Sequence, residues 1–219
     1  MPIVEAFGIC LLANITDTLY TLVVQKNATY ACCDVLLGRY ATAVQLKALL
    51  PQLTRDEYSQ LRRGYKVLFY HIFGDSRMVA AHIAKYNECL RGYAFDETPT
   101  GVLMFEWPKG RKHKKNQHEK PTQTGLREFK EETGINIANT IIVDDATYLV
   151  YRSTNVNTGV TYVSKIFIAT MPDVAELPVI PKKIGRDKET RAASWVPVSQ
   201  LAQTAQALIR DATRPAGAV

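Results

Sequence analysis

The 219-residue sequence lacks an apolar run long enough to cross a bilayer, since its longest runs of this kind are Phe7 to Ala13 and Ile166 to Ala169. Its Met-Pro-Ile-Val-Glu start also lacks the basic region of a signal peptide. We therefore expect a soluble intracellular protein with no membrane partner.

Cysteine is scarce, and the four cysteines show no Cys-x-x-Cys spacing of the kind that indicates a zinc or redox site: Cys10, Cys32, Cys33 and Cys89. A chain of this length with 47% apolar residues can bury a core without disulfides, and disorder is not expected. We expect buried, reduced thiols.

Acidic residues are in the minority, 21 against 27 Lys and Arg, and the resulting charge of +6 is unevenly distributed. Residues 109–120 hold one acid, Glu119, among a cluster of basic residues: Lys109, Arg111, Lys112, Lys114, Lys115 and Lys120. One interpretation is a solvated loop. The other is a binding surface for polyanions, nucleic acid first, with the first five of these residues contacting RNA or phosphate.

The pattern of apolar residues predicts strands and helices in one chain. Segments 5–13 and 20–26 predict a hairpin around Asn14, Thr16 and Asp17. Helical patterns follow over 44–50, 54–63 and 75–91, so residues 41–97 read as a mostly helical insertion. A strand is expected over 102–105, and a helix over 121–133 that Gly134 ends. Further strands are expected over 140–143, 148–153, 161–170 and 192–196, before a helix over 199–213.

The helix predicted over 121–133 carries three carboxylates on one face. At about 100° per residue, Glu128, Glu131 and Glu132 fall within an arc of roughly 100°, while Leu126 and Phe129 point toward a core. Like charges at this spacing each cost roughly 0.2–0.5 kcal/mol in an isolated helix. A hard cation would relieve the repulsion, and Mg²⁺ suits it because it combines carboxylates with water and phosphate oxygens. A solvent-facing acidic helix is the alternative.

The segment Glu119 to Ile135 reads Glu, seven residues, then Arg127-Glu128-Phe129-Lys130-Glu131-Glu132-Thr133-Gly134-Ile135. Average composition gives such a pattern on the order of 10⁻⁷ per starting position. It resembles the Nudix hydrolases, whose motif is Gly-x5-Glu-x7-Arg-Glu-U-x-Glu-Glu-x-Gly-U, with U a bulky aliphatic or aromatic residue. The departure is upstream, where eight residues instead of five separate Gly110 from Glu119.

The resemblance implies a role for each matching residue. Glu128, Glu131 and Glu132 would bind Mg²⁺ or Mn²⁺, helped by the Gly110 carbonyl, while Arg127 braces the carboxylates and Glu119 supports loop and helix. Glu128, Glu132 and Arg127 would be catalytic. Beside three acids, Arg127 is also the obvious fixed counter-charge on electrostatic grounds.

The resemblance also implies the architecture. We expect an α+β protein with the Nudix α/β/α sandwich and a mixed sheet. Residues 1–40 and 98–219 would form the catalytic domain, and residues 41–97 the helical insertion subdomain near the N-terminus.

Further segments, Phe7 to Cys10, Leu22 to Lys26, Asp34 to Tyr40 and Phe105 to Gly110, resemble Nudix proteins of large DNA viruses that remove mRNA caps. Some of these relatives also hydrolyse diphosphoinositol polyphosphates. Glu189 to Trp195 resembles the Glu-x-Arg-x-x-x-Trp stretch of cellular decapping enzymes, in which a glutamate acts as general base or extra metal ligand. Glu189 is the candidate for that role, and an ordinary loop carboxylate is the alternative.

These resemblances imply a decapping enzyme that binds capped mRNA in the cytoplasm, in the host cytoplasm if the protein is viral, and releases methylated GDP and 5′-monophosphate RNA. One alternative is a pyrophosphohydrolase of diphosphoinositol polyphosphates or nucleoside derivatives. Another is a catalytically inactive RNA-binding module, against which the intact carboxylates argue. Trp107, Tyr148 and Tyr162 are candidates for stacking on a base, although aromatic residues in strands are more often core.

Overall fold

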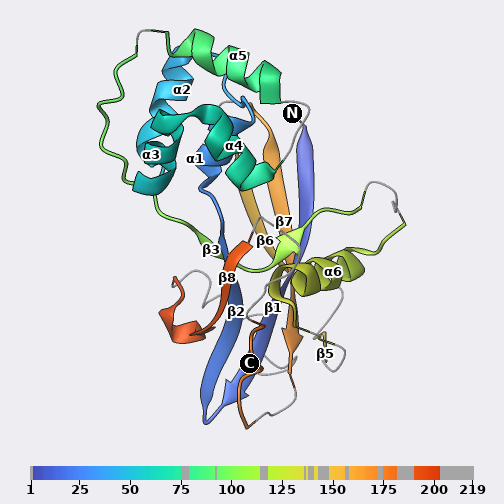
Figure 1. The fold of residues 1–219 in the computed structure, drawn as a ribbon. Coiled ribbons are helices and arrows are strands. Elements are labelled where there is room, and N and C mark those ends of the chain that lie inside the picture. Colours follow the sequence, from blue (N-terminus) through green and yellow to red (C-terminus); the bar gives the residue numbers. More distant parts are fainter. Residues whose placement is uncertain are drawn as a thin grey trace. The chain divides into compact units, whose positions relative to one another are not determined.

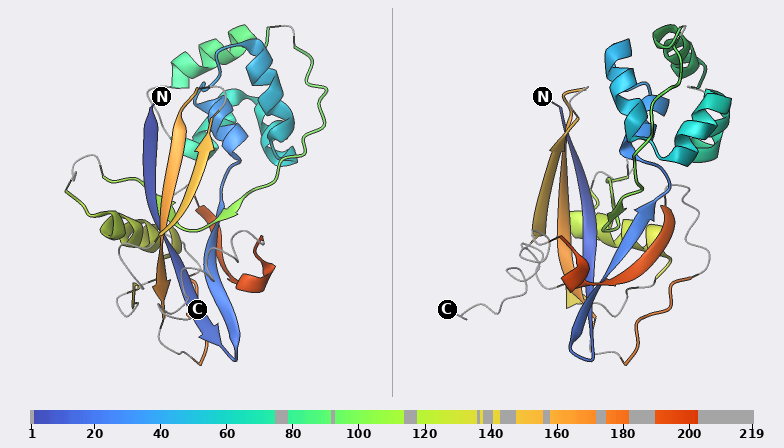
Figure 2. Two further views of the ribbon diagram at one scale, coloured as in Figure 1. Left: turned by 180° about the vertical axis from the view of Figure 1, so that it is seen from behind. Right: turned by 90° about the vertical axis from the view of Figure 1, so that its left-hand side faces the viewer.

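The chain forms two compact units, which contain elements from separate parts of the sequence (Figures 1 and 2). The sheet unit comprises Met1–Gln25, Phe105–Thr154 and Val160–Val219, and the helical unit comprises Lys26–Met104 and Asn155–Gly159. The computed structural model describes residues 2–74, 79–91, 93–113, 118–135, 137, 141–142, 148–155, 158–171, 175–181 and 190–202.

The sheet unit is built on one mixed sheet (Figure 1). Its described strands are β1 (Ile3–Ile15), β2 (Thr18–Lys26), β3 (Phe105–Glu106), β4 (Lys109–Gly110), β5 (Ile141–Ile142), β6 (Tyr148–Thr154), β7 (Thr161–Thr170) and β8 (Thr190–Pro197). Their order is β3-β2-β1-β7-β5, with β4 beside β1, β6 beside β7 and β8 beside β2. Because β1 pairs with β7 in parallel and with β2 and β4 antiparallel, the predicted α+β class with a mixed sheet is confirmed.

The predicted N-terminal hairpin is confirmed as β1 and β2. Thr16 and Asp17 at its turn have φ values of 46° and 62°, the left-handed backbone that matches the twist of a tight hairpin. The centre of β1 is buried on both faces, since Phe7, Ile9 and Leu11 join one apolar cluster and Cys10 and Leu12 join another. This two-sided burial explains why the segment reads as a continuous apolar run.

Helix α6 (Pro121–Thr133) has the predicted bounds and packs on the sheet through contacts with β1, β4 and β7 (Figure 1). Pro121 opens it at a position that needs no amide donor, and Gly134 ends it in the left-handed conformation, with φ 70°. Its fully buried Phe129 packs with Phe7 and Phe167 of the sheet. A Cβ on Gly125 would lie 3.1 Å from the Gly8 carbonyl oxygen, so glycine there allows α6 to approach β1 closely.

The sheet face opposite Phe129 buries Leu149 and Ile168 against Trp107, Val198 and Leu201. The indole of Trp107 donates from Nε1 to Thr21 Oγ1 at 3.1 Å, so this ring belongs to the core. The predicted helix over 199–213 lies mostly outside the described residues, and its described start is a 3-10 turn, η2 (Val198–Gln200).

The helical unit has its own apolar core, in which Leu36, Leu50, Leu53 and Phe69 are buried. Its helices are α1 (Tyr30–Leu36), α2 (Ala43–Leu49), the 3-10 helix η1 (Leu50–Gln52), α3 (Arg55–Arg63), α4 (Tyr65–Phe73) and α5 (Val79–Cys89). The helices predicted over 44–50 and 54–63 are confirmed as α2 and α3, and α5 falls within the predicted 75–91. Among the described residues, no helix combines the length and apolarity needed to span a membrane.

The helical unit extends beyond the predicted range 41–97 on both sides. It begins at Lys26 because α1 supplies Ala31, Val35 and Leu36 to its core. It includes 155–159 because Asn155 Nδ2 donates to Asp34 Oδ2 at 2.6 Å.

The strand predicted over 102–105 is wrong in its extent, since β3 covers only Phe105–Glu106. The backbone amides of Thr100 and Gly101 instead donate to the carbonyls of Pro51 and Leu53, at 2.8 and 2.9 Å. These bonds hold the backbone that precedes β3 against η1 and Leu53, within the helical unit.

A buried carboxylate links the starts of two helices in this unit. Glu57 accepts hydrogen bonds from the Thr29 amide at 2.7 Å, the Thr29 hydroxyl at 3.0 Å and the Thr54 amide at 2.7 Å. Thr29 and Thr54 are the N-caps of α1 and α3. Glu57 therefore satisfies donors that the helices themselves leave unpaired.

Glu57→Gln is expected to destabilise the protein by about 2–3 kcal/mol. The substitution replaces one carboxylate oxygen, which accepts hydrogen bonds, with an NH₂ group, which would face the donors of Thr29 or Thr54. Urea unfolding followed by far-ultraviolet circular dichroism measures the change. The matched control is Glu88→Gln, on the exposed surface of α5, which should stay within about 0.5 kcal/mol of the parent. Equal stabilities of the two variants would contradict the proposed linkage.

Candidate metal-binding site

Helix α6 carries Glu128, Glu131 and Glu132, and the three side chains differ in their exposure to solvent. The Glu131 side chain is 50% exposed and that of Glu128 is 14% exposed. Glu132 is only 1% exposed. The helical spacing predicted this shared face, and the packing of Phe129 against the sheet orients it.

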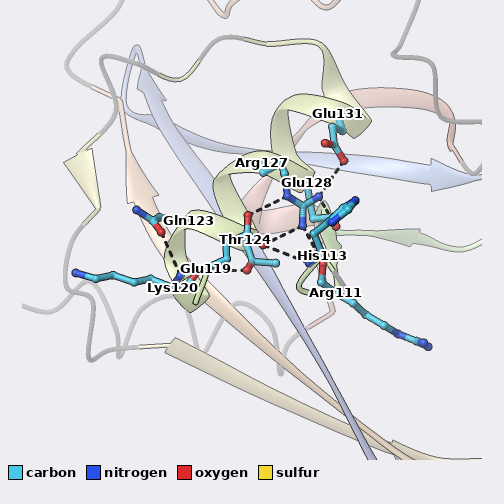
Figure 3. Close-up of polar contacts among 9 residues, drawn as sticks. All are labelled: Arg111, His113, Glu119, Lys120, Gln123, Thr124, Arg127, Glu128 and Glu131. Atoms are coloured by element: carbon cyan, nitrogen blue, oxygen red, sulfur yellow. Dashed lines mark hydrogen bonds and ion pairs between the residues drawn. The ribbon is translucent and has the colours of Figure 1, made fainter. Parts of the chain in front are cut away.

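Arg127 contacts most of the acidic side chains around α6 (Figure 3). Its Nη1 donates to Glu128 Oε1 at 2.8 Å and to Glu131 Oε2 at 3.1 Å. Its Nε and Nη2 donate to Glu119 at 3.0 and 3.3 Å, and Nη2 also donates to the Arg111 carbonyl at 2.9 Å. One guanidinium thus joins the helix carboxylates to the loop before the helix, a geometry that the planar fork of arginine suits.

Glu119 is a buried member of this cluster, to which Arg127 donates two hydrogen bonds. The hydrogen bond from Arg127 lowers the pKa of Glu119, and bonds from Thr124 and the His113 amide act in the same direction. Reciprocally, the bond to Glu119 raises the pKa of Arg127. Both groups are therefore charged at neutral pH, and they tie the loop to the helix as fixed charges.

Gly110 lies against Glu128. Strand β4 brings it there by pairing antiparallel with β1, where Gly110 stands opposite Phe7. A Cβ on Gly110 would collide with the carboxylate carbon and both carboxylate oxygens of Glu128. The longer spacing between Gly110 and Glu119 therefore does not separate Gly110 from the carboxylate face.

Glu132 is held from the same strand. The Lys109 amide donates to Glu132 Oε2 at 3.0 Å. The Lys109 ammonium group contacts the Glu106 carboxylate in an ion pair, so its charge is balanced within the protein. The predicted contact of Lys109 with RNA or phosphate stays a prediction; within the protein, its amide contacts Glu132 and its ammonium group contacts Glu106.

The donor set fits a hard divalent cation, because Glu128, Glu131, Glu132 and the Gly110 carbonyl offer only oxygen atoms. Gly110 contributes to the fit in a second way, since its missing side chain leaves the space that the Glu128 carboxylate occupies. Within the described residues, no three His, Cys, Asp or Glu side chains already converge as a metal cage.

Comparisons with solved structures give distant similarities. The chain is similar to a C. elegans Ap4A hydrolase in a binary complex, with 12% identity, 94% of this chain and 93% of that chain covered, and a TM-score of 0.47. It is similar to the NUDIX domain of Shewanella oneidensis NrtR complexed with ADP ribose, with 11% identity, 96% and 88% covered, and a TM-score of 0.44. No protein-family model and no curated protein matches the sequence.

Several predicted site residues lie outside the described part of the chain: Lys114, Lys115 and Glu189. Arg111 and Lys112 are described and lie directly after β4. The Arg111 guanidinium is 6.0 Å from the centre of the Tyr162 ring, and Lys112 Nζ is 5.9 Å from the centre of the Phe7 ring.

Sequence reasoning missed Lys165 and Glu5, which form an ion pair of 2.8 Å between β7 and β1. The available signal was slight: Lys165 is the one basic residue in the run Thr161 to Thr170. A lone charge in an otherwise apolar strand indicates a position at the edge of a buried face.

Proposed function

We propose that this chain is a divalent-metal-dependent hydrolase of the Nudix type that cleaves a phosphoanhydride bond. The observation that carries the proposal is the cluster in which Arg127 bridges Glu119, Glu128 and Glu131 while Gly110 abuts Glu128. Each of these residues holds a position of the motif that the sequence resembles. An acidic face that served only solubility would not need a bridging arginine and a glycine fitted to one carboxylate.

In this proposal, some residues would bind the metal ion and others orient its ligands. Glu128, Glu131, Glu132 and the Gly110 carbonyl would hold Mg²⁺ or Mn²⁺. The bound ion would supply neutralisation of phosphate charge and a more acidic water. Arg127 keeps Glu128 and Glu131 oriented, and the Lys109 amide keeps Glu132 oriented, so little reorganisation is needed during the reaction.

For the substrate we propose capped RNA, from which the enzyme would release methylated GDP and 5′-monophosphate RNA. Support comes from the sequence resemblance to viral decapping proteins and from the basic run 109–120. The helical unit adds surface that phosphoanhydride chemistry alone does not require. Extra surface suits a long substrate, because binding energy from the RNA body can position the cap phosphates.

Capped RNA of a few tens of nucleotides is expected to be hydrolysed with kcat/KM at least about tenfold above free cap dinucleotide. Cap-labelled RNA, the dinucleotide and a diphosphoinositol polyphosphate are incubated with full-length protein and Mg²⁺ or Mn²⁺, and the initial rates are compared. Uncapped RNA should compete, because the phosphates of the RNA body contribute affinity. Chelation with EDTA should abolish turnover of every substrate.

The rival substrates give distinct outcomes in this assay. Equal efficiency on dinucleotide and long RNA, without inhibition by uncapped RNA, would favour a hydrolase of small nucleoside-diphosphate derivatives. Preference for the inositol compound would assign the basic surface to a polyphosphate. RNA binding without hydrolysis of any substrate would overturn the enzymatic proposal.

A further inference from the structure

We propose that Tyr148, Lys165 and Lys112 form a nucleotide subsite beside the carboxylates, with a nucleobase on Tyr148 and its phosphate at the two lysines. The inference rests on the proposed function and deepens it, since it assigns the residues that bind the nucleotide part of the substrate. The ligand class is a nucleoside 5′-phosphate.

Two lysines share one aromatic ring next to the metal-binding residues. Lys112 Nζ and Lys165 Nζ each lie 5.9 Å from the centre of the Phe7 ring. They reach it from different elements, Lys112 from the segment after β4 and Lys165 from β7. Both side chains are half-buried, so each ammonium group is held beside the same aromatic ring.

The balance of charge at this place favours an anion. Glu5 pairs with Lys165 at 2.8 Å and raises the pKa of that lysine, which keeps it charged at neutral pH. The carboxylate of Glu5 can balance the positive charge of one of the two ammonium groups. A phosphate would offset the other, and it would accept hydrogen bonds from both lysines.

Tyr148 extends the subsite away from the carboxylates. Lys165 Nζ lies 5.7 Å from the centre of its ring, and the ring packs edge to face against Phe167 at 5.6 Å. The edge-to-face contact holds the ring in position, while 38% of the residue stays exposed. An aromatic ring that is fixed and exposed beside a cation suits a nucleobase with an attached phosphate.

The other two aromatic candidates do not meet these conditions. Trp107 is tied to Thr21 in the core on the opposite sheet face. Tyr162 alternates with Lys165 along β7, so its side chain leaves the sheet on the other face, where Arg111 lies over its ring. Tyr148 stands opposite Phe167 in the register of β6 and β7, and Phe167 packs with Phe129 of α6.

The subsite is continuous with the carboxylates. Lys112 follows Gly110 by two residues, and the intervening Arg111 carbonyl is held by Arg127 at 2.9 Å. Since Gly110 abuts Glu128, a phosphate at Lys112 would sit beside the metal-binding face. The nucleotide would thus project from the scissile anhydride along the sheet toward β6.

Binding of a nucleoside monophosphate tests the subsite without requiring turnover. Guanosine 5′-monophosphate, ribose 5-phosphate and inorganic phosphate are titrated into full-length protein in EDTA by calorimetry. Tyr148→Leu should weaken the nucleotide by about tenfold and leave ribose 5-phosphate unchanged, and Tyr148→Phe should restore binding. Lys112→Gln and Lys165→Gln should weaken all three ligands.

Two matched controls separate a specific site from a general surface effect. Tyr151→Leu removes a tyrosine of the same strand that is 60% exposed. Lys66→Gln removes a lysine that lies over Tyr70 at 5.7 Å in the helical unit. Both controls should bind as the parent does.

The outcomes also separate the subsite from the proposed enzyme. Specific nucleotide binding by a protein that hydrolyses no phosphoanhydride would support the subsite and overturn the enzymatic function. Hydrolysis with the same KM in Tyr148→Leu, Lys165→Gln and the two controls would overturn the subsite and leave the enzyme standing. Absence of nucleotide binding by the parent protein would also overturn the subsite.

Discussion

Glu132→Gln is expected to lower kcat at saturating Mg²⁺ by about a hundredfold or more, because it would remove a proposed anionic metal ligand at nearly constant volume. Glu132 is the most buried of the three α6 glutamates, and the Lys109 amide fixes its Oε2 at 3.0 Å. The glutamine oxygen can accept the same bond, so the fold should survive. Circular dichroism checks the fold, and the initial rate of hydrolysis measures the loss.

The control for this variant is Glu88→Gln, the same chemical change on the exposed surface of α5. It should turn over substrate as the parent does. If Glu132→Gln also stays within about threefold of the parent, Glu132 does not bind the metal and the site assignment fails.

The local part of the site could be predicted from sequence, because helix periodicity and caps act over a few residues. Pro121 and Gly134 define both ends of α6, and the spacing of Glu128, Glu131 and Glu132 sets their common face. Arg127 could be anticipated as their counter-charge. Its bond to the Arg111 carbonyl could not, since it depends on where the loop before α6 returns.

Contacts between segments that lie far apart in the sequence could not be predicted from it. Lys165 and Phe7 meet only because β7 pairs with β1 in parallel, a register that no local pattern encodes. Helix α4 was not predicted for another reason, since Tyr65 to Phe73 is rich in aromatic and β-branched residues, which favour strands. Packing of Leu68, Phe69 and Ile72 in the helical core outweighs that preference.

Gly110→Ala is expected to reduce kcat/KM by about a hundredfold, because the new methyl group must displace the Glu128 carboxylate from its present position. Gly110 does not have a positive φ angle, so alanine causes no backbone strain there. The effect should therefore be local. Thermal unfolding measures the stability of the variant, and hydrolysis of the best substrate measures the loss.

A double-mutant cycle with Glu128→Gln tests whether the methyl group acts through Glu128. If it does, the double variant should fall no more than about threefold below Glu128→Gln alone, because the displaced group has already lost its charge. Multiplication of the two single effects would mean that Gly110 acts independently of Glu128. The steric fit between Gly110 and Glu128 would then be a packing detail, and the part of the site that β4 supplies would reduce to the Gly110 carbonyl and the Lys109 amide.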